Sequence, residues 1–348
     1  QELQEGNRSI FSRKLQELMT DRLNKGQQTI LFLNRRGYAG FVSCRSCGEV
    51  MKCPHCDVSL SEHKGGRLIC HYCGYTQPMP KLCPKCGSKY ILGFKAGTQQ
   101  IEEKLKELYP GVRTLRMDAD TTRTKDSYEK ILSSFANGEA DVLIGTQMIV
   151  KGHDFPKVTL VGILAADLSL NASDYRAGER TFQLLTQAVG RAGRGGLPGE
   201  AVIQTYQPDH YAITCAAAQD YESFYQEEIL YRELSGYPPV AHMLAVQIYG
   251  KEEENVKQLA LRLTDVVKSN MDFLSGKQKE QSNKKIQVLG PAPANISKIN
   301  DIYRYVFYVK HAEYDVLVEV KDRLEETLRQ WQPRQMSIQF DFDPVSVL

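Results

Sequence analysis

Residues 141–156 read DVLIGTQMIVKGHDFP, a short apolar run followed by a turn rich in polar residues. The apolar run, 141–144, has the continuous hydrophobicity of a strand that is buried on both faces of a sheet. In an open parallel sheet, ligands bind beyond the carboxyl ends of the strands, which is where these polar residues follow. The stretch therefore predicts an α/β fold with candidate binding groups at Thr146, Gly152 and Asp154. The alternative is a turn whose side chains only cap the neighbouring backbone.

Strand-like and helix-like segments alternate on both sides of this stretch as far as residue 235. We predict strands at 29–34, 90–94, 113–117, 141–144, 158–164 and 201–206. The predicted helices are 98–109, 123–136 and 178–189, with a helical bridge at 208–234. Apolar strands separated by amphipathic helices indicate a parallel sheet that is covered by helices on both faces.

The junction at Gly97 and Thr98 is a second candidate binding site, because it lies between a predicted strand and the amino terminus of a predicted helix. Backbone N–H groups at such a terminus bind anions. Thr98 is equally suited to a structural role as the N-cap of helix 98–109.

Residues 187–194 read QAVGRAGR and are predicted to form the final turns of a helix. Arg191 and Arg194 are three positions apart, so they would share a helix face and reach one polyanion together. An arginine beside the γ-phosphate of a nucleotide stabilises the charge on the group being transferred. A surface pair that only forms salt bridges is the alternative.

Eight of the nine cysteines form four Cys-x-x-Cys pairs, namely Cys44/Cys47, Cys53/Cys56, Cys70/Cys73 and Cys83/Cys86. Two such pairs supply four thiolates to one tetrahedral zinc ion and leave no open position for a substrate. The sequence therefore predicts two structural zinc ions, against disulfides of a secreted protein or redox-active pairs. His55 and His71 lie inside two of the pairs, but eight thiols already suffice for two ions.

The pattern changes from residue 236. Predicted strands at 242–249, 286–289, 303–309 and 336–342 flank predicted helices at 252–270 and 313–330. This βαββαβ order predicts a small α+β domain of the ferredoxin-like or ribosomal-S10-like type. Within it, residues 303–308 read YRYVFY. Strand packing is the first explanation for these aromatic side chains, and stacking of single-stranded bases is the alternative.

The composition is that of a globular chain. Its 44 Lys and Arg nearly cancel its 42 Asp and Glu, so the net charge of +2 points to no particular partner. Its longest apolar runs are far shorter than a bilayer requires, which excludes a membrane protein of the helical class. Zinc-binding thiols persist in a reducing compartment, and we therefore expect the cytoplasm. Because residue 1 is Gln and not Met, we expect the sequence to be part of a longer protein.

Together these motifs resemble a known motor fold. GTQMIVKGHDFP (145–156) is similar to motif V and QAVGRAGR to motif VI of the second motor lobe of superfamily 2 helicases, and LFLNRRGY (31–38) lies where motif IV would. With the cysteine pairs inserted after LFLNRRGY and DFDP at 341–344, the whole chain resembles the PriA family of bacterial replication-restart helicases. The resemblance implies a RecA-like second lobe at 1–43 and 88–235, an inserted two-zinc module at 44–87 and an S10-like or ferredoxin-like C-terminal domain at 236–348.

The resemblance also implies roles for residues that would bind the nucleotide. Arg191 and Arg194 would face the γ-phosphate, and Gln187 would position the attacking water or the motif itself. Gly152 and Asp154 would line the nucleotide cleft.

DNA contacts and the zinc pairing follow from the same resemblance. The implied DNA contacts are Thr146, Thr98 and Arg35, for which Arg36 is an equal candidate. The implied zinc pairing is nested, and the spacing is compatible with it but does not require it. One ion would be bound by Cys44, Cys47, Cys83 and Cys86, and the other by Cys53, Cys56, Cys70 and Cys73.

As a function, the resemblance implies an ATP-dependent 3′–5′ DNA helicase that unwinds stalled forks and initiates primosome assembly. The implied ligands are DNA, ATP with magnesium, single-stranded-DNA-binding protein and primosome proteins, with the helicase a monomer in the cytoplasm, associated with the nucleoid. The sequence contains neither a G-x-x-x-x-G-K-[ST] phosphate loop nor an Asp-Glu-x-His motif, so we expect these 348 residues alone to be inactive. A passive zinc-ribbon adaptor and a DNA-uptake helicase are the alternatives.

Overall fold

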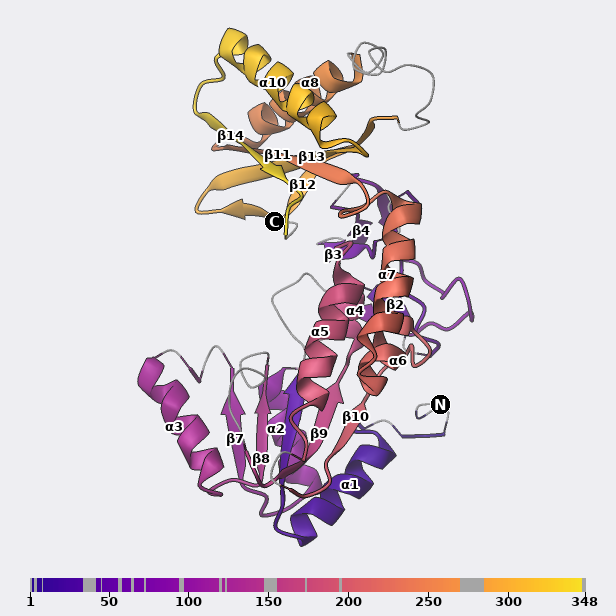
Figure 1. Ribbon diagram of the computed structural model, residues 1–348, viewed down its shortest axis with the longest axis vertical. Coiled ribbons are helices and arrows are strands. Elements are labelled where there is room, and N and C mark those ends of the chain that lie inside the picture. Colours follow the sequence, from indigo (N-terminus) through magenta and orange to yellow (C-terminus); the bar gives the residue numbers. More distant parts are fainter. Residues whose placement is uncertain are drawn as a thin grey trace. The chain divides into compact units, whose positions relative to one another are not determined.

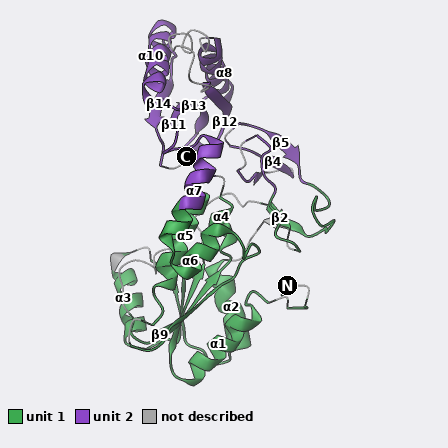
Figure 2. Ribbon diagram, turned by 45° about the vertical axis from the view of Figure 1, so that its right-hand side comes forward, with its two compact units in different colours: residues 1–50, 80–172, 176–225 green, residues 51–79, 173–175, 226–348 purple. Residues whose placement is uncertain are grey.

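The computed structural model divides by its internal contacts into two compact units (Figure 1, Figure 2). Unit 1 comprises residues 1–50, 80–172 and 176–225, and unit 2 comprises residues 51–79, 173–175 and 226–348. The described residues are 2, 5–7, 9–33, 42–44, 46–55, 58–63, 66–71, 73–93, 97–118, 121–122, 124–146, 155–172, 174–193, 196–269 and 285–345. The unit boundaries at 50/51 and 79/80 fall within the segment 44–87, whose assignment as one inserted module stays a prediction.

A five-stranded parallel sheet forms the core of unit 1. Its strand order is β10-β9-β1-β8-β7, and each neighbouring pair is parallel. All residues of β1, β8 and β9 are buried, as a sheet covered on both faces requires. The strands are β1 (Gln28–Leu33), β7 (Thr114–Met117), β8 (Val142–Gly145), β9 (Val158–Leu164) and β10 (Glu200–Ile203). The predicted parallel sheet is confirmed.

Helices cover both faces of this sheet. On one face, Leu15 of α1 packs with Leu31 of β1, and α2 contributes to the same core. On the other face, Phe135 of α3 and Leu185 of α5 pack with Phe32. The helices of this region are α1 (Arg13–Asn24), α2 (Thr98–Leu108), α3 (Lys125–Ala136), α4 (Asp167–Leu170), α5 (Ala177–Val189), α6 (Tyr211–Ala218) and α7 (Tyr221–Ser235), which continues into unit 2.

Two local predictions in unit 1 were wrong. The strand predicted at 90–94 is β6 (Ile91–Gly93), which lies outside the parallel sheet and pairs antiparallel with β2 (Val42–Cys44). β2 and β6 lie at the two ends of the cysteine-rich segment. When the chain enters and leaves such a segment at the same place, its two ends run side by side in opposite directions. The N-cap of α2 is Gly97, so Thr98 is the first helical residue and not the predicted cap.

The carboxyl-terminal part of unit 2 is an α+β fold in the predicted βαββαβ order. Its antiparallel sheet has the strand order β12-β13-β11-β14, and α8 and α10 lie on the same face of it (Figure 1). The elements are β11 (His242–Gly250), α8 (Glu253–Ser269), β12 (Gln287–Ile299), β13 (Ile302–His311), α10 (Tyr314–Trp331) and β14 (Met336–Phe342). The predicted domain type is confirmed.

Strand β12 is much longer than the predicted 286–289. Gly290, Pro291 and Pro293 follow the predicted strand, and proline lacks the N–H through which a strand pairs with its neighbour. β12 lies at the edge of the sheet and shifts its register between Leu289 and Ala292, so the strand continues through these residues.

Residues 51–79 add a small zinc-ribbon-like sheet to unit 2. It consists of β3 (Ser61–His63), β4 (Arg67–Ile69) and β5 (Thr76–Pro78), joined antiparallel in the order β3-β4-β5. Among the described residues of both units, no helix has the length and apolar character to span a membrane.

Candidate functional sites

Helix α5 ends where the prediction of a helix at 178–189 places its end, so Arg191 does not lie on the helix face that it was predicted to share with Arg194. The helix stops at Val189 with Gly190 as its C-cap, and Arg191 lies in the turn that follows. In this turn the N–H of Arg191 donates to the carbonyl of Ala188 at 3.1 Å, a tighter spacing than in an α-helix. Arg191 is half-buried, Gln187 is exposed in the last helical turn, and Arg194 lies outside the described residues.

This turn is fixed at the amino end of β9. The N–H of Gly193 donates to the carbonyl of Val158, the first residue of β9, at 3.0 Å. A Cβ atom on Gly199 would lie 2.3 Å from the carbonyl carbon of Ala192, so the two backbone segments touch. Val158 in turn donates to Phe155 at 3.0 Å, and the predicted cleft residues just before Phe155, Gly152 and Asp154, lie outside the described residues.

Thr98 and Thr146 belong to the opposite edge of the sheet, at the carboxyl ends of β7 and β8. The N–H of Thr146 donates to the carbonyl of Met117 at 3.3 Å, across the ends of these two strands. The hydroxyl of Thr98 donates to Oδ2 of Asp118 at 2.5 Å. The structure therefore brings two of the three predicted DNA contacts to one edge, and the third, Arg35, lies outside the described residues.

Sequence reasoning missed Asp118 and Arg116 at this edge. Asp118 follows β7 directly, is buried, and exchanges hydrogen bonds with Thr121. Arg116 Nε lies 2.8 Å from Asp118 Oδ2, and Arg116 Nη1 lies 3.7 Å from Glu102 Oε2. The signal was available, because 118–122 reads DADTT, a polar run directly after a predicted strand.

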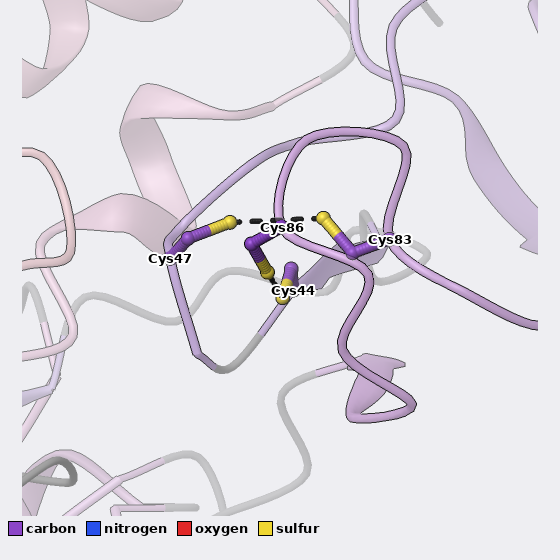
Figure 3. Close-up of side chains that lie close together, drawn as sticks. All are labelled: Cys44, Cys47, Cys83 and Cys86. Atoms are coloured by element: carbon purple, nitrogen blue, oxygen red, sulfur yellow. Dashed lines mark hydrogen bonds between the residues drawn. The ribbon is translucent and has the colours of Figure 1, made fainter.

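Four cysteine sulfurs from two distant pairs meet in unit 1 (Figure 3). Cys44 Sγ lies 3.6 Å from Cys86 Sγ, and Cys47 Sγ lies 3.6 Å from Cys83 Sγ. A tetrahedral zinc ion with Zn–S bonds of about 2.3 Å requires sulfurs roughly 3.8 Å apart. A disulfide would instead need about 2.05 Å, so the arrangement fits a metal and not a covalent bridge.

The backbone around Cys44 is folded to hold a thiolate. The N–H of Gly48 donates to the Cys44 carbonyl at 2.9 Å, and Gly48 adopts the left-handed conformation with φ 78°. The N–H of Ser46 points at Cys44 Sγ at 3.4 Å. Burial opposes ionisation of Cys44, but the backbone N–H groups of Cys47 and Ser46 and the neighbouring thiols lower its pKa to about 6. Gly74 and Gly87 repeat the same turn after Cys70 and Cys83.

The second cysteine group lies in unit 2. Cys53, Cys70 and Cys73 place their sulfurs within 4.8 Å of one another, and Cys53 Sγ lies 3.5 Å from Cys73 Sγ. The fourth predicted ligand, Cys56, lies outside the described residues. Among the described cysteines, Cys44 and Cys47 thus lie with Cys83 and Cys86, and Cys53 lies with Cys70 and Cys73, which is the order of a nested pairing.

The two histidines of the cysteine pairs differ in their surroundings. His71 is fully buried, with Nδ1 3.0 Å from the carbonyl oxygen of Pro293 and Nε2 3.1 Å from His63 Nε2. Both ring nitrogens of His71 therefore have partners other than a metal. His55 is exposed and lies edge-on to the Tyr75 ring.

Three family models match the chain. Residues 82–196 match the "Helicase conserved C-terminal domain", residues 53–78 the "PriA DNA helicase Cys-rich region (CRR) domain", and residues 233–345 the "Primosomal protein N C-terminal domain". The three matches lie in the order that the sequence predicts, and they identify the parallel sheet of unit 1 as a helicase C-terminal domain and the cysteine module as zinc-binding.

The curated proteins that align with nearly the whole chain share one name. The "Replication restart protein PriA" of Bacillus subtilis (strain 168) is 43% identical over 350 residues, which cover 100% of this chain and 42% of the relative. The protein of the same name from Synechocystis sp. is 42% identical over 351 residues, covering 99% of this chain and 40% of the relative. That of Haemophilus influenzae is 35% identical over 327 residues, covering 94% and 42%. The chain thus spans about two fifths of the length of these relatives, and it belongs to the PriA family of replication restart proteins.

Proposed function

We propose that the chain supplies the second motor lobe of an ATP-dependent 3′–5′ DNA helicase that unwinds stalled replication forks and initiates primosome assembly. The observation that carries this proposal is the separation of two polar sites in unit 1. Arg191 lies at the amino edge of the parallel sheet, next to the start of β9, while Thr98, Asp118 and Thr146 meet at the carboxyl edge. A motor lobe needs such an arrangement, because it has to couple a nucleotide on one surface to a strand on another.

At the amino edge, Arg191 and Arg194 stabilise charge on the γ-phosphate, and Gln187 positions the attacking water. Gly152 and Asp154 line the same cleft. Arginine is suited to this role because its planar guanidinium binds two phosphate oxygens at once. ATP with magnesium requires a phosphate loop, which the 348 residues do not contain, so this chain alone does not turn over ATP.

At the carboxyl edge, Thr98, Thr146 and Arg35 contact the backbone of one DNA strand. Hydroxyl and guanidinium groups position a strand through its phosphates without reading its sequence, as a translocating motor requires. Asp118 accepts a hydrogen bond from the Thr98 hydroxyl and lies beside Arg116, so it holds the Thr98 side chain at the carboxyl edge of the sheet.

The cysteines bind two zinc ions that have a structural role. The first ion is held by Cys44, Cys47, Cys83 and Cys86, and the second by Cys53, Cys56, Cys70 and Cys73. A shell of four thiolates leaves no position for a substrate, so each ion closes a loop and activates no water. The partners of the complete helicase are forked and single-stranded DNA, single-stranded-DNA-binding protein and primosome proteins, and it acts as a cytoplasmic, nucleoid-associated monomer.

The test uses a chimera in which this chain replaces the matching segment of the Bacillus subtilis relative. Arg191→Ala should lower DNA-stimulated ATP hydrolysis by a factor on the order of 10³, the scale of an arginine that stabilises phosphoryl transfer, while DNA affinity is retained. Thr146→Ala should weaken DNA affinity and leave hydrolysis at saturating DNA near the parent value. A passive adaptor predicts no hydrolysis by the parent chimera, and measurable hydrolysis by the isolated chain would refute its predicted inactivity.

A further inference from the structure

One turn of the first cysteine group (Cys44, Cys47, Cys83 and Cys86) faces solvent. Residues 84–87 are all exposed, and Cys86 is among them. The turn 44–48 instead packs inward, since a Cβ atom on Gly48 would lie 2.7 Å from Tyr206 Cβ. A reagent in solution therefore reaches the first cysteine group from the side of Cys86.

Among the described cysteines of the two groups, Cys86 alone is exposed. The others are buried or half-buried, namely Cys44, Cys47, Cys53, Cys70, Cys73 and Cys83. In the second group, Cys70 is fully buried, and a Cβ atom on the following Gly74 would lie 3.3 Å from the Pro291 carbonyl oxygen. The edge strand β12 therefore shields this part of the second group from solvent.

A second sulfur lies close to Cys86. Cys86 Sγ and Cys44 Sγ are 3.6 Å apart, and Figure 3 shows the two sulfurs together. The turns that carry them are also joined by Ser46 and Ser88, whose hydroxyl oxygens are 2.7 Å apart. This contact holds the turns next to each other without a metal ion. Because a disulfide needs about 2.05 Å between its sulfurs, only a small shift of the two side chains would allow one to form.

We propose that Cys86 is a site of oxidation by hydroperoxides and that Cys44 is its resolving partner, so that the first cysteine group changes from a zinc site to a disulfide. The inference rests on the proposed zinc ligation of this group. Oxidation of a cysteine requires thiolate character and access to the oxidant. A cysteine that binds zinc is a thiolate, and Cys86 adds the exposure that the other described ligands lack.

The reaction removes two electrons from two thiolates and reduces one hydroperoxide. The Cys86 sulfur attacks one peroxide oxygen, so an S–O bond forms, the O–O bond breaks, and the other oxygen leaves as water or an alcohol after taking a proton from solvent. The Cys44 thiolate then attacks the Cys86 sulfur, which forms the S–S bond and releases hydroxide. Only Cys47 and Cys83 remain as thiolates of the group, too few to hold a zinc ion, so one ion is lost for each disulfide formed.

The experiment uses the complete chain loaded with zinc and treated with hydrogen peroxide. A chromogenic chelator measures the release of zinc, and differential alkylation followed by mass spectrometry identifies the oxidised cysteines. One of the two zinc ions should leave first, and at that stage a disulfide should join the peptides that contain Cys44 and Cys86. Dithiothreitol and added zinc should restore the lost ion. A sample that receives catalase before the peroxide should keep both ions.

Two variants separate oxidation of Cys86 from other causes of zinc loss. In Cys86→His an imidazole replaces the thiolate as a zinc ligand but forms neither a sulfenic acid nor a disulfide. This variant should bind two ions and keep both during the treatment that removes one from the parent. Cys215→Ser removes a half-buried cysteine outside both groups and should release zinc as the parent does.

The proposal is overturned if both ions leave at the same rate, if the first disulfide is not Cys44–Cys86, or if Cys86→His loses zinc as fast as the parent. Should Cys86→His bind only one ion from the start, the disulfide map of the parent decides. A parent chain that binds fewer than two ions before oxidation would contradict the zinc sites themselves. Failure of the zinc assignment and failure of the oxidation site are therefore distinguishable, and neither readout depends on ATP hydrolysis.

Discussion

His71 Nδ1 lies 3.0 Å from the carbonyl oxygen of Pro293, so a cysteine pair and the edge strand β12 share a hydrogen bond. A carbonyl oxygen can only accept, which assigns the proton to Nδ1 and leaves Nε2 to accept from His63 at 3.1 Å. Burial lowers the pKa of His71, and the nearby His63 acts in the same direction, against the Pro293 hydrogen bond. A neutral His71 therefore connects the second cysteine group to the C-terminal sheet.

His71→Ala should lower the free energy of unfolding by about 2 kcal/mol, because it removes a buried partner and leaves the Pro293 carbonyl unsatisfied. Zinc content should stay at the parent value, since neither ring nitrogen of His71 faces the metal group. Urea unfolding and a colorimetric zinc assay on the same samples measure both quantities. The matched control is His55→Ala, an exposed histidine in the neighbouring pair, which should change neither. Loss of one zinc ion from His71→Ala would identify it as a ligand instead.

The two cysteine groups should lose their metal independently, because they lie in different compact units. Cys47→Ser and Cys73→Ser should each remove one of two zinc ions. Hydrogen exchange should then increase in 42–50 and 83–93 for Cys47→Ser, and in 53–79 and β12 for Cys73→Ser. Cys215→Ser, a half-buried cysteine of α6, is the control and should retain both ions. If Cys47→Ser instead exposed residues 53–60, neighbouring pairs would share an ion and the nested grouping would be wrong.

Sequence patterns predicted those parts of the fold that depend on local spacing. The strand 158–164 and the strand 336–342 were predicted to the residue, since both are apolar or alternating runs with clear ends. The pairing of β6 with β2 was not predictable, because an apolar run of three residues does not state which sheet it joins. The end of α5 at residue 189 was predicted, but the sequence did not show that Arg191 lies in the turn beyond it, at the opposite edge of the sheet from Thr146.

Close backbone packing makes Gly199 a critical residue of the QAVGRAGR turn. A Cβ atom there would lie 2.3 Å from both the Ala192 carbonyl carbon and the Gly193 nitrogen, which cannot be relieved by a rotamer change. Gly199→Ala should therefore displace the turn and lower ATP hydrolysis by the chimera at least 100-fold, since a displacement of about 1 Å is enough for such a loss. Leu197→Ala is the control in the same loop, because the Leu197 side chain is exposed. Equal activity of the two variants would show that the turn does not position the arginines.

Lowering the pH should reduce the folding stability of unit 1, because it weakens the ion pair between Arg113 and Asp141. The Arg113 backbone N–H donates to Asp141 Oδ2 at 3.0 Å, and its guanidinium donates to Oδ1 at 2.5 Å. Partial burial opposes ionisation of Asp141, but these bonds and the Arg113 charge hold the pKa of Asp141 below its ordinary value. Because the pKa is lower in the folded state, the stabilisation is complete above the unfolded pKa of about 3.9 and is lost as the pH falls through the folded value.

Asp141→Asn should consequently be less stable than the parent by about 1 kcal/mol at neutral pH, a value reduced for the solvent exposure of Arg113. The difference should shrink once the pH falls below about 4, where the parent carboxylate is also neutral. Urea unfolding of both proteins across this range measures it, and loss of zinc in acid affects both alike. Glu227→Gln, an exposed carboxylate of α7, should show no such pH-dependent difference. A deficit for Asp141→Asn that stays constant down to about pH 3 would mean that the substitution acts through packing and not through the charge of Asp141.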